Sequence, residues 1–237
     1  MLPAFSIVIP AFNEESRIAT TLRLTLDYLR NVSPESELIV ENDGSTDATA
    51  TITREVFSET KVATRLLENF PNRGKGAAVR SGLLAAQKPI GIFFDADLST
   101  PLSETPKVIE PIANGDLDIA FGSRAVDRSL IGQHQPWRRE QAGRVFNLLV
   151  RLATGLPFWD TQCGFKAFRL DVCRLILGAA HVDGFAFDVE LLYLAQRAGL
   201  RIREIPVRWN HAEGSKVDLI HDSLRMLREV IALRVHL

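Results

Sequence analysis

Short apolar segments alternate with amphipathic ones through the first hundred residues, and this alternation constrains the fold more than any other feature of the chain. Apolar runs at residues 5–10, 37–41, 61–67 and 90–94 have the length and composition of buried strands. Segments with a helical period lie between them, at residues 13–31, 46–56 and 75–87. Strand alternating with helix predicts an α/β fold with a mostly parallel sheet covered on both faces.

The second half of the chain has a less regular pattern. We expect helices at residues 102–113, 140–154 and 188–198, and strands at 117–122 and 201–207. Residues 125–139 carry several charges, glycine and proline without a clear period, which predicts a mobile loop over the site. No element is assigned to residues 157–168. No repeat or linker divides the 237 residues, so we expect one domain.

Composition excludes several classes of function. The formal net charge of −1 creates no global field that would attract nucleic acid, so any phosphate has to be bound by a local site. The N-terminus lacks the basic segment and apolar core of a secretory signal. The apolar runs are far shorter than the roughly 20 residues that cross a bilayer. We therefore expect a cytoplasmic protein, and leave contact with the membrane surface open.

Three polar turns, at residues 11–15, 42–47 and 95–100, each follow a predicted strand. Ligands of parallel sheets bind beyond the carboxyl ends of the strands, so all three turns should face one crevice. Asp95 and Asp97 are placed to bind Mg²⁺ or Mn²⁺, which prefer oxygen ligands and share them with phosphates. The alternative is a solvated turn that caps a helix. Asp43 either accepts hydrogen bonds from a base or ribose or stabilises its own turn.

Two further motifs carry candidate chemistry. Residues 72–76, which include Lys75, open a helix with two glycines and two cations, an arrangement that suits an anion. The alternative is a helix start with solvated charges. Asp160 lies among large aromatic residues and is a candidate general base with a raised pKa. The alternatives for Asp160 are a helix cap or a buried ion pair.

The C-terminal stretch from Val217 has the period of an amphipathic helix. Ile220, Leu224, Leu227 and Ile231 share one predicted face. We expect this face to pack on the protein's own core rather than on lipid.

In order and spacing, these motifs resemble the family 2 glycosyltransferases, specifically the group that acts on dolichyl phosphate. The resembling segments are residues 9–14, 42–47, 72–76, 95–99, 122–124 and 160–166. The resemblance implies a GT-A fold, in which a Rossmann-like, mixed but mostly parallel sheet is flanked by helices. It implies a single domain over residues 1–237, with a nucleotide-sugar half (1–100), an acceptor half (101–216) and the C-terminal helix (217–237).

The resemblance also assigns roles to individual residues. Asp95 and Asp97 would hold the metal and diphosphate, Arg124 would meet phosphate charge, and Asp160 would act as a base or orient the acceptor. The other residues implied for the nucleotide sugar are Pro10, Ala11, Asn13, Glu14, Asp43, Lys75 and Ala96. Two positions depart from the pattern of many relatives: Asn42 replaces a carboxylate, and Ser99 replaces a glutamine.

The implied function is inverting, metal-dependent transfer of a hexose, expected to be glucose from UDP-glucose, to a polyprenyl or dolichyl phosphate. The alternatives are a soluble sugar, protein or polysaccharide acceptor, GDP-mannose as donor, or nucleotide-sugar binding without catalysis. A lipid phosphate has to be met at the bilayer surface. Candidate contacts are the C-terminal helix, the loop 125–139 and the helix 140–154, with the arginines Arg128, Arg138, Arg139, Arg144 and Arg151.

Overall fold

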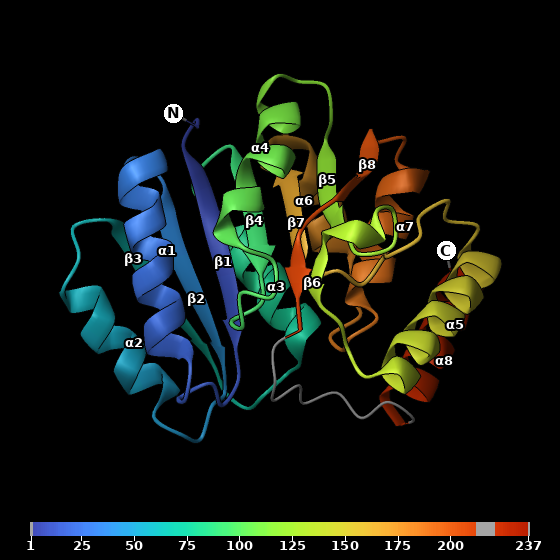
Figure 1. The fold of residues 1–237 in the computed structure, drawn as a ribbon, viewed down its shortest axis with the longest axis horizontal. Helices are drawn as coiled ribbons and strands as arrows, with labels where there is room; N and C mark the ends of the chain where they lie inside the picture. Colours follow the sequence, from blue (N-terminus) through green and yellow to red (C-terminus); the bar gives the residue numbers. More distant parts are fainter. Residues whose placement is uncertain (1, 212–220, 237) are drawn as a thin grey trace.

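The computed structural model describes residues 2–211 and 221–236. The elements are β1 (Phe5–Ala11), α1 (Ile18–Val32), β2 (Glu37–Asp43), α2 (Thr49–Ser58), β3 (Ala63–Asn69), α3 (Lys75–Ala85), β4 (Ile90–Phe94), the 3-10 helix η1 (Leu102–Glu104), α4 (Thr105–Ala113), β5 (Ile119–Ser123), the 3-10 helix η2 (Arg128–Leu130), β6 (Ile131–Gln133), α5 (Trp137–Thr154), β7 (Phe165–Arg169), α6 (Leu170–Ala179), α7 (Phe187–Arg197), β8 (Ile202–Pro206), β9 (Trp209–Asn210) and α8 (His221–His236). Figure 1 shows their arrangement.

Seven strands form one sheet in the order β3-β2-β1-β4-β7-β5-β8. Neighbours β1, β2, β3 and β4 pair in parallel, as β5 does with β8. Strand β7 lies between β4 and β5 and is antiparallel to both. The mixed, mostly parallel sheet that the sequence predicts is confirmed. One sheet runs through both predicted halves. The division into a nucleotide-sugar half and an acceptor half stays a prediction.

Side chains on the two faces of the sheet form two hydrophobic cores. Along β1, Ile7 and Ile9 pack on one face with residues of α1 and α4, and Val8 packs on the other with residues of α3 and α7. This alternation is the period of a strand whose two faces are both covered. Helices α5 and α8 lie side by side at the β8 end of the sheet (Figure 1) and complete the second core.

Strand β7 and helix α6, like the short strands β6 and β9, were not predicted from the sequence. In β7 a lysine and an arginine interrupt the apolar run, so its strand pattern is weak. Lys166 is fully buried there, because Nζ lies 2.6 Å from Asp188 Oδ1 on α7. An ion pair of this sequence separation gives no local signal.

The predicted loop at residues 125–139 is shorter than expected. Strand β6 pairs in parallel with β9, and α5 begins at Trp137 rather than at residue 140. Helix α1 also begins later than predicted, at Ile18. The Asn13 amide donates instead to Ser45 Oγ in the turn after β2, and the Glu14 amide donates to Thr49 Oγ1 at the start of α2.

The predicted face of the C-terminal helix is partly wrong. Met226, Val230 and Leu233 are buried against α5, whereas Ile231 is about half exposed. Leu227 packs at the edge of this core. Residues 217–220 and the side chain of Leu224 lie outside the described part. The expectation that the helix packs on the protein's own core is confirmed for the part described. Across residues 2–211 and 221–236, no helix combines the length and apolar character needed to span a bilayer.

Candidate active site

An acidic cleft of about 590 Å³ lies at the carboxyl ends of β1, β2 and β4. The structure brings the three predicted polar turns to it. Among the predicted residues, Asn13 does not line the cleft; those that do are Pro10, Ala11, Glu14, Asp43, Lys75, Asp95, Ala96 and Asp97. Residues from α8 close one side of it, among them Arg225. We use the name acidic cleft for this cavity below.

Asn13 instead joins two of the turns. Its backbone has a positive φ of 53°, a left-handed conformation that asparagine tolerates better than most residues. Its amide donates to Ser45 Oγ at 2.9 Å, and its Oδ1 accepts from the Thr46 amide at 2.8 Å. Asn13 therefore holds together the turns after β1 and β2, which line the cleft, without lining the cleft itself.

Asp43 binds the loop before α3, which is a third segment lining the cleft. Its two carboxylate oxygens accept hydrogen bonds from the backbone amides of Arg73 (2.9 Å) and Gly74 (2.7 Å). Asp43 thus stabilises the loop that opens α3. Each oxygen keeps a second lone pair that a ligand can use.

Asp95 and Lys75 form the charged centre of the cleft, where Lys75 Nζ lies 2.5 Å from Asp95 Oδ1. Burial disfavours the charged ammonium, but the carboxylates of Asp95, Asp188 and Asp97 outweigh it and raise the pKa of Lys75 above its usual value. On its other side Asp95 contacts Gly164, where an added Cβ would lie 2.3 Å from Asp95 Oδ2. Only glycine at position 164 leaves room for this carboxylate.

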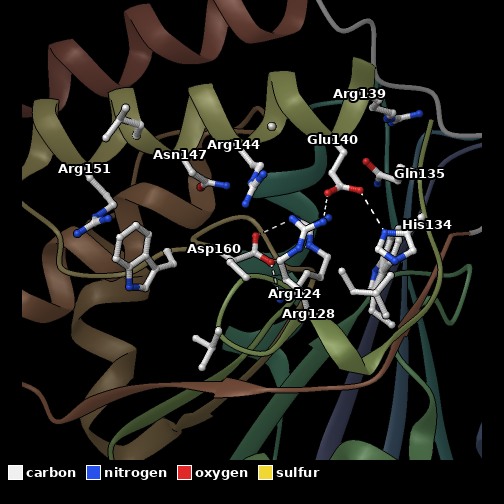
Figure 2. A pocket seen from close by; sticks show the side chains of 17 residues that line it. Arg124, Arg128, His134, Gln135, Arg139, Glu140, Arg144, Asn147, Arg151 and Asp160 are labelled. Atoms are coloured by element: carbon white, nitrogen blue, oxygen red, sulfur yellow. Dashed lines mark hydrogen bonds and ion pairs between the residues drawn. The ribbon is translucent and has the colours of Figure 1, made fainter. Parts of the chain in front are cut away.

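A second cavity has a volume of about 640 Å³ and is here called the arginine pocket. Asp160 lines it, and Gly164 of the same segment, 160–164, lies against Asp95 of the acidic cleft. Five arginines line the arginine pocket: Arg124, Arg128, Arg139, Arg144 and Arg151. Four of them belong to the set predicted to meet a lipid phosphate: Arg128, Arg139, Arg144 and Arg151. Arg124, which is predicted to meet phosphate charge, lines this pocket too. The side chain of Arg138 lies outside the described part. Figure 2 shows Arg144 and Asn147 pointing from α5 toward Arg124 and Asp160. Arg144 has no ion-pair partner among the described residues.

Asp160 lies at the floor of the arginine pocket, buried beside Arg124. Burial raises the pKa of its carboxyl, but the charge and hydrogen bonds of Arg124 outweigh burial and leave the pKa below its usual value. The predicted raised pKa of Asp160 is therefore wrong, and its role as a general base stays a prediction. The alternative of a buried ion pair is the one that the geometry supports.

Similarity to known protein families agrees with this geometry. The model described as glycosyl transferase family 2 matches residues 6–177. The chain belongs to glycosyl transferase family 2. The predicted family resemblance is thereby confirmed, and the protein is a glycosyltransferase.

Individual relatives and solved structures are similar to this chain over nearly its whole length. The Saccharomyces cerevisiae dolichyl-phosphate beta-glucosyltransferase is 34% identical over 97% of this chain and 74% of its own length. The human dolichyl-phosphate beta-glucosyltransferase is 33% identical over 97% of this chain and 74% of its own. Among solved structures, glucosyl-3-phosphoglycerate synthase from Mycobacterium tuberculosis, in complex with Mn²⁺, UDP-glucose and phosphoglyceric acid, has a TM-score of 0.69. It is 22% identical and covers 98% of this chain and 78% of that one. This likeness shows the GT-A fold.

The donor set of the family 2 cleft fits a hard divalent cation. Asp95 and Asp97 offer carboxylate oxygens, the ligands that Mg²⁺ and Mn²⁺ prefer. Asp97 is oriented by the Ser99 amide, which donates to its Oδ1 at 2.9 Å. The described residues contain no cluster of three or more His, Cys, Asp or Glu side chains that could hold a metal. A cation bound here would therefore take its remaining ligands from substrate phosphate and water.

The structure adds a residue that supports the segment around Asp160 and that the sequence did not indicate. Glu204, on β8, accepts hydrogen bonds from the Trp159 amide (2.8 Å), the Asp160 amide (2.7 Å) and Ser123 Oγ (2.6 Å). It thereby fastens the segment that carries Asp160 to the end of β5, next to Arg124. A charged residue in a strand near the sheet edge gives no signal of this role in the sequence.

Proposed function

We propose that this glycosyltransferase transfers glucose from UDP-glucose to the phosphate of a polyprenyl or dolichyl phosphate, with inversion at the anomeric carbon. The observation that carries the proposal is the arginine pocket, which the segment 160–164 links to the acidic cleft: Asp160 lines the pocket, and Gly164 lies against Asp95 of the cleft. The names of the yeast and human relatives support this acceptor and sugar. The Mycobacterium complex supports a uridine nucleotide donor.

The charges of the two cavities suit the two substrates. In the acidic cleft, Lys75 at the start of α3 lines the position expected for the donor diphosphate. Asp95 and Asp97 would hold a divalent cation, which when bound would add positive charge next to the leaving diphosphate. In the arginine pocket, Arg144 and its neighbours attract a phosphate and hold it by charge-assisted hydrogen bonds.

The reaction needs no general base. A phosphate monoester has a second pKa of about 6, so it is largely dianionic at neutral pH. One phosphate oxygen attacks the anomeric carbon from the face opposite UDP, the new carbon–oxygen bond forms, and the electron pair of the broken bond leaves with UDP. No proton is transferred. Asp160 stays ionised and keeps Arg124 in place, which gives it a positioning role.

Turnover assays with matched substrates test the proposal. The protein is incubated with UDP-glucose or GDP-mannose, with Mg²⁺ or Mn²⁺, and with an isoprenyl phosphate or the corresponding free alcohol. We expect UDP release only with UDP-glucose, a divalent cation and the phosphate. Equal turnover of the alcohol would contradict a phosphate nucleophile, and preference for GDP-mannose would contradict the donor.

A soluble phosphorylated acceptor is the second candidate. The arginine pocket also suits a small anion, and the Mycobacterium enzyme was solved with phosphoglyceric acid. Phosphoglyceric acid and other sugar and polysaccharide acceptors therefore belong in the same assay. Turnover of a soluble acceptor at a rate above that of the isoprenyl phosphate would favour this candidate.

A further inference from the structure

Helix α5 exposes a stripe of large apolar side chains. Val145 is 58% exposed, Leu148 53%, Leu149 39% and Leu152 69%. Their spacing of three and four residues places them on one side of the helix. We call these four residues the α5 stripe. Single exposed leucines are common on soluble proteins, but a contiguous row on one helix marks an interaction surface.

The α5 stripe is not the face that holds α5 on the protein. That function belongs to Phe146 and Val150, which are buried in the core shared with α8. Helix α5 is therefore apolar on two sides, and the core covers only one of them. Among the described residues, nothing covers the side with Val145, Leu149 and Leu152.

The stripe continues into the arginine pocket. Leu148 belongs to both, and Arg144 and Arg151 extend from the same helix into the pocket. The Arg151 guanidinium stacks on the exposed Trp159 ring, 3.6 Å from its centroid. Trp137, also exposed, stands at the first turn of α5. Leucines beside arginines and tryptophans form the composition of a segment that lies in the headgroup region of a bilayer.

We propose that α5 is a membrane-docking helix, whose stripe inserts into the surface of an anionic bilayer and places the arginine pocket at headgroup level. Charge selects this occupant over a second copy of the chain. A symmetric contact between two copies through α5 would bring two arginine-rich rims together, whereas anionic headgroups neutralise them. That the pocket then receives the phosphate of a membrane-embedded acceptor rests on the proposed function.

Vesicle binding of a double variant tests the docking helix. Leu149→Glu with Leu152→Glu places two negative charges on the stripe without touching the core. The matched control is Leu24→Glu with Leu175→Glu, which makes the same changes at exposed leucines of α1 and α6. Partition is measured by flotation with phosphatidylcholine vesicles that contain or lack phosphatidylglycerol.

We expect the parent and the control to bind the anionic vesicles, and the stripe variant to lose about tenfold or more in partition coefficient. Unchanged binding of the stripe variant would overturn the proposal. So would a parent that binds no vesicles but changes from dimer to monomer in sedimentation when the stripe is substituted, because a second copy would then cover α5. Melting temperatures of both variants confirm that they are folded.

Activity separates this proposal from the proposed function. With a short, water-soluble isoprenyl phosphate, the stripe variant should turn over as fast as the parent. With a long-chain isoprenyl phosphate embedded in vesicles, it should be slower by the same factor by which its binding falls. If vesicle binding falls but neither acceptor is used even by the parent, the docking helix stands and the proposed acceptor is wrong.

Discussion

The guanidinium of Arg124 forms a bidentate ion pair with the carboxylate of Asp160. Nε lies 2.7 Å from Oδ2 and Nη2 lies 2.6 Å from Oδ1, while the Arg124 amide donates to Oδ2 at 2.9 Å. Arg124 directly follows β5, and Asp160 lies in the segment before β7. Because the pair joins these two segments, it sets the geometry of the arginine pocket. Its charge state and its loss can both be tested.

Asp160→Asn should lower both stability and turnover. The substitution leaves the largely buried Arg124 without its counter-charge, and breaking such a pair costs about 3 kcal/mol. The lowered pKa of Asp160 stabilises the folded state at pH values above the ordinary aspartate pKa, and this stabilisation is lost as pH falls through the lowered value. Chemical denaturation at neutral and at acidic pH measures the difference.

The gap in unfolding free energy between the parent and Asp160→Asn should therefore close in acid. In the same variant, the pH profile of the remaining kcat should keep the shape of the parent's profile, because no proton passes through Asp160. Loss of a titration near neutral pH in that profile would reinstate the carboxylate as a general base. Asp116→Asn, at an exposed turn, serves as the control.

Lys75→Gln should change the affinities for metal and for donor in opposite directions. The ammonium 2.5 Å from Asp95 Oδ1 repels a cation that uses this carboxylate, so its removal should tighten Mn²⁺ binding. The same ammonium attracts diphosphate, so UDP should bind about tenfold more weakly. Calorimetric titrations measure both constants. Lys61→Gln, at an exposed site, should change neither, and a parallel loss of both affinities in Lys75→Gln would contradict the competing-charge argument.

Glu204→Gln should raise the KM for the acceptor and leave the KM for the donor unchanged. A glutamine side chain offers one acceptor oxygen and turns an NH₂ group toward one of the three donors that Glu204 now serves. We expect a loss of about 1–2 kcal/mol in unfolding free energy and a displaced Asp160. Glu55→Gln on the exposed side of α2 controls for the loss of charge. An equal rise in both KM values would indicate general unfolding of the site rather than a shift of the segment 159–160.

Glu41→Gln should stabilise the protein more at pH 8 than at pH 5. Burial raises the pKa of Glu41 from 4.5 to about 7, against the opposing hydrogen bond from Ser81. A raised pKa means that the folded state favours the protonated carboxyl, so its contribution is present below the ordinary glutamate pKa and is lost as pH rises through about 7. Glutamine mimics the protonated form at every pH. Melting temperatures at the two pH values measure the effect, with the exposed Glu35→Gln as control. A gain of equal size at both values would show that Glu41 does not titrate between them.

The sequence predicted those parts of the fold and site whose signals are local. Buried parallel strands are short apolar runs, and the turns after β1, β2 and β4 carry their polar residues within a few positions. Strand β7 was missed because its lysine is neutralised by Asp188, a partner that only the folded chain supplies. Glu204 was missed for the same reason. The arginine pocket was half predicted: the arginines were visible, but their convergence with Arg124 and Asp160 depends on how α5 packs.

Gly164→Ala tests whether the segment 160–164 positions the candidate metal ligands Asp95 and Asp97. An added Cβ would lie 2.3 Å from Oδ2 and 2.7 Å from Cγ of Asp95, so the carboxylate has to move away from Gly164. Because Asp97 is held separately by the Ser99 amide, the two carboxylates should no longer bind one cation together. We expect weaker Mn²⁺ binding by about tenfold or more, with a corresponding rise in the metal concentration needed for half-maximal turnover. Gly178→Ala adds the same methyl group on α6, where nothing lies within 4 Å, and should leave metal binding unchanged. Equal metal affinity in the two variants would mean that Asp95 is not a metal ligand, and the positive charge of Lys75 would then have to hold the donor diphosphate in the acidic cleft.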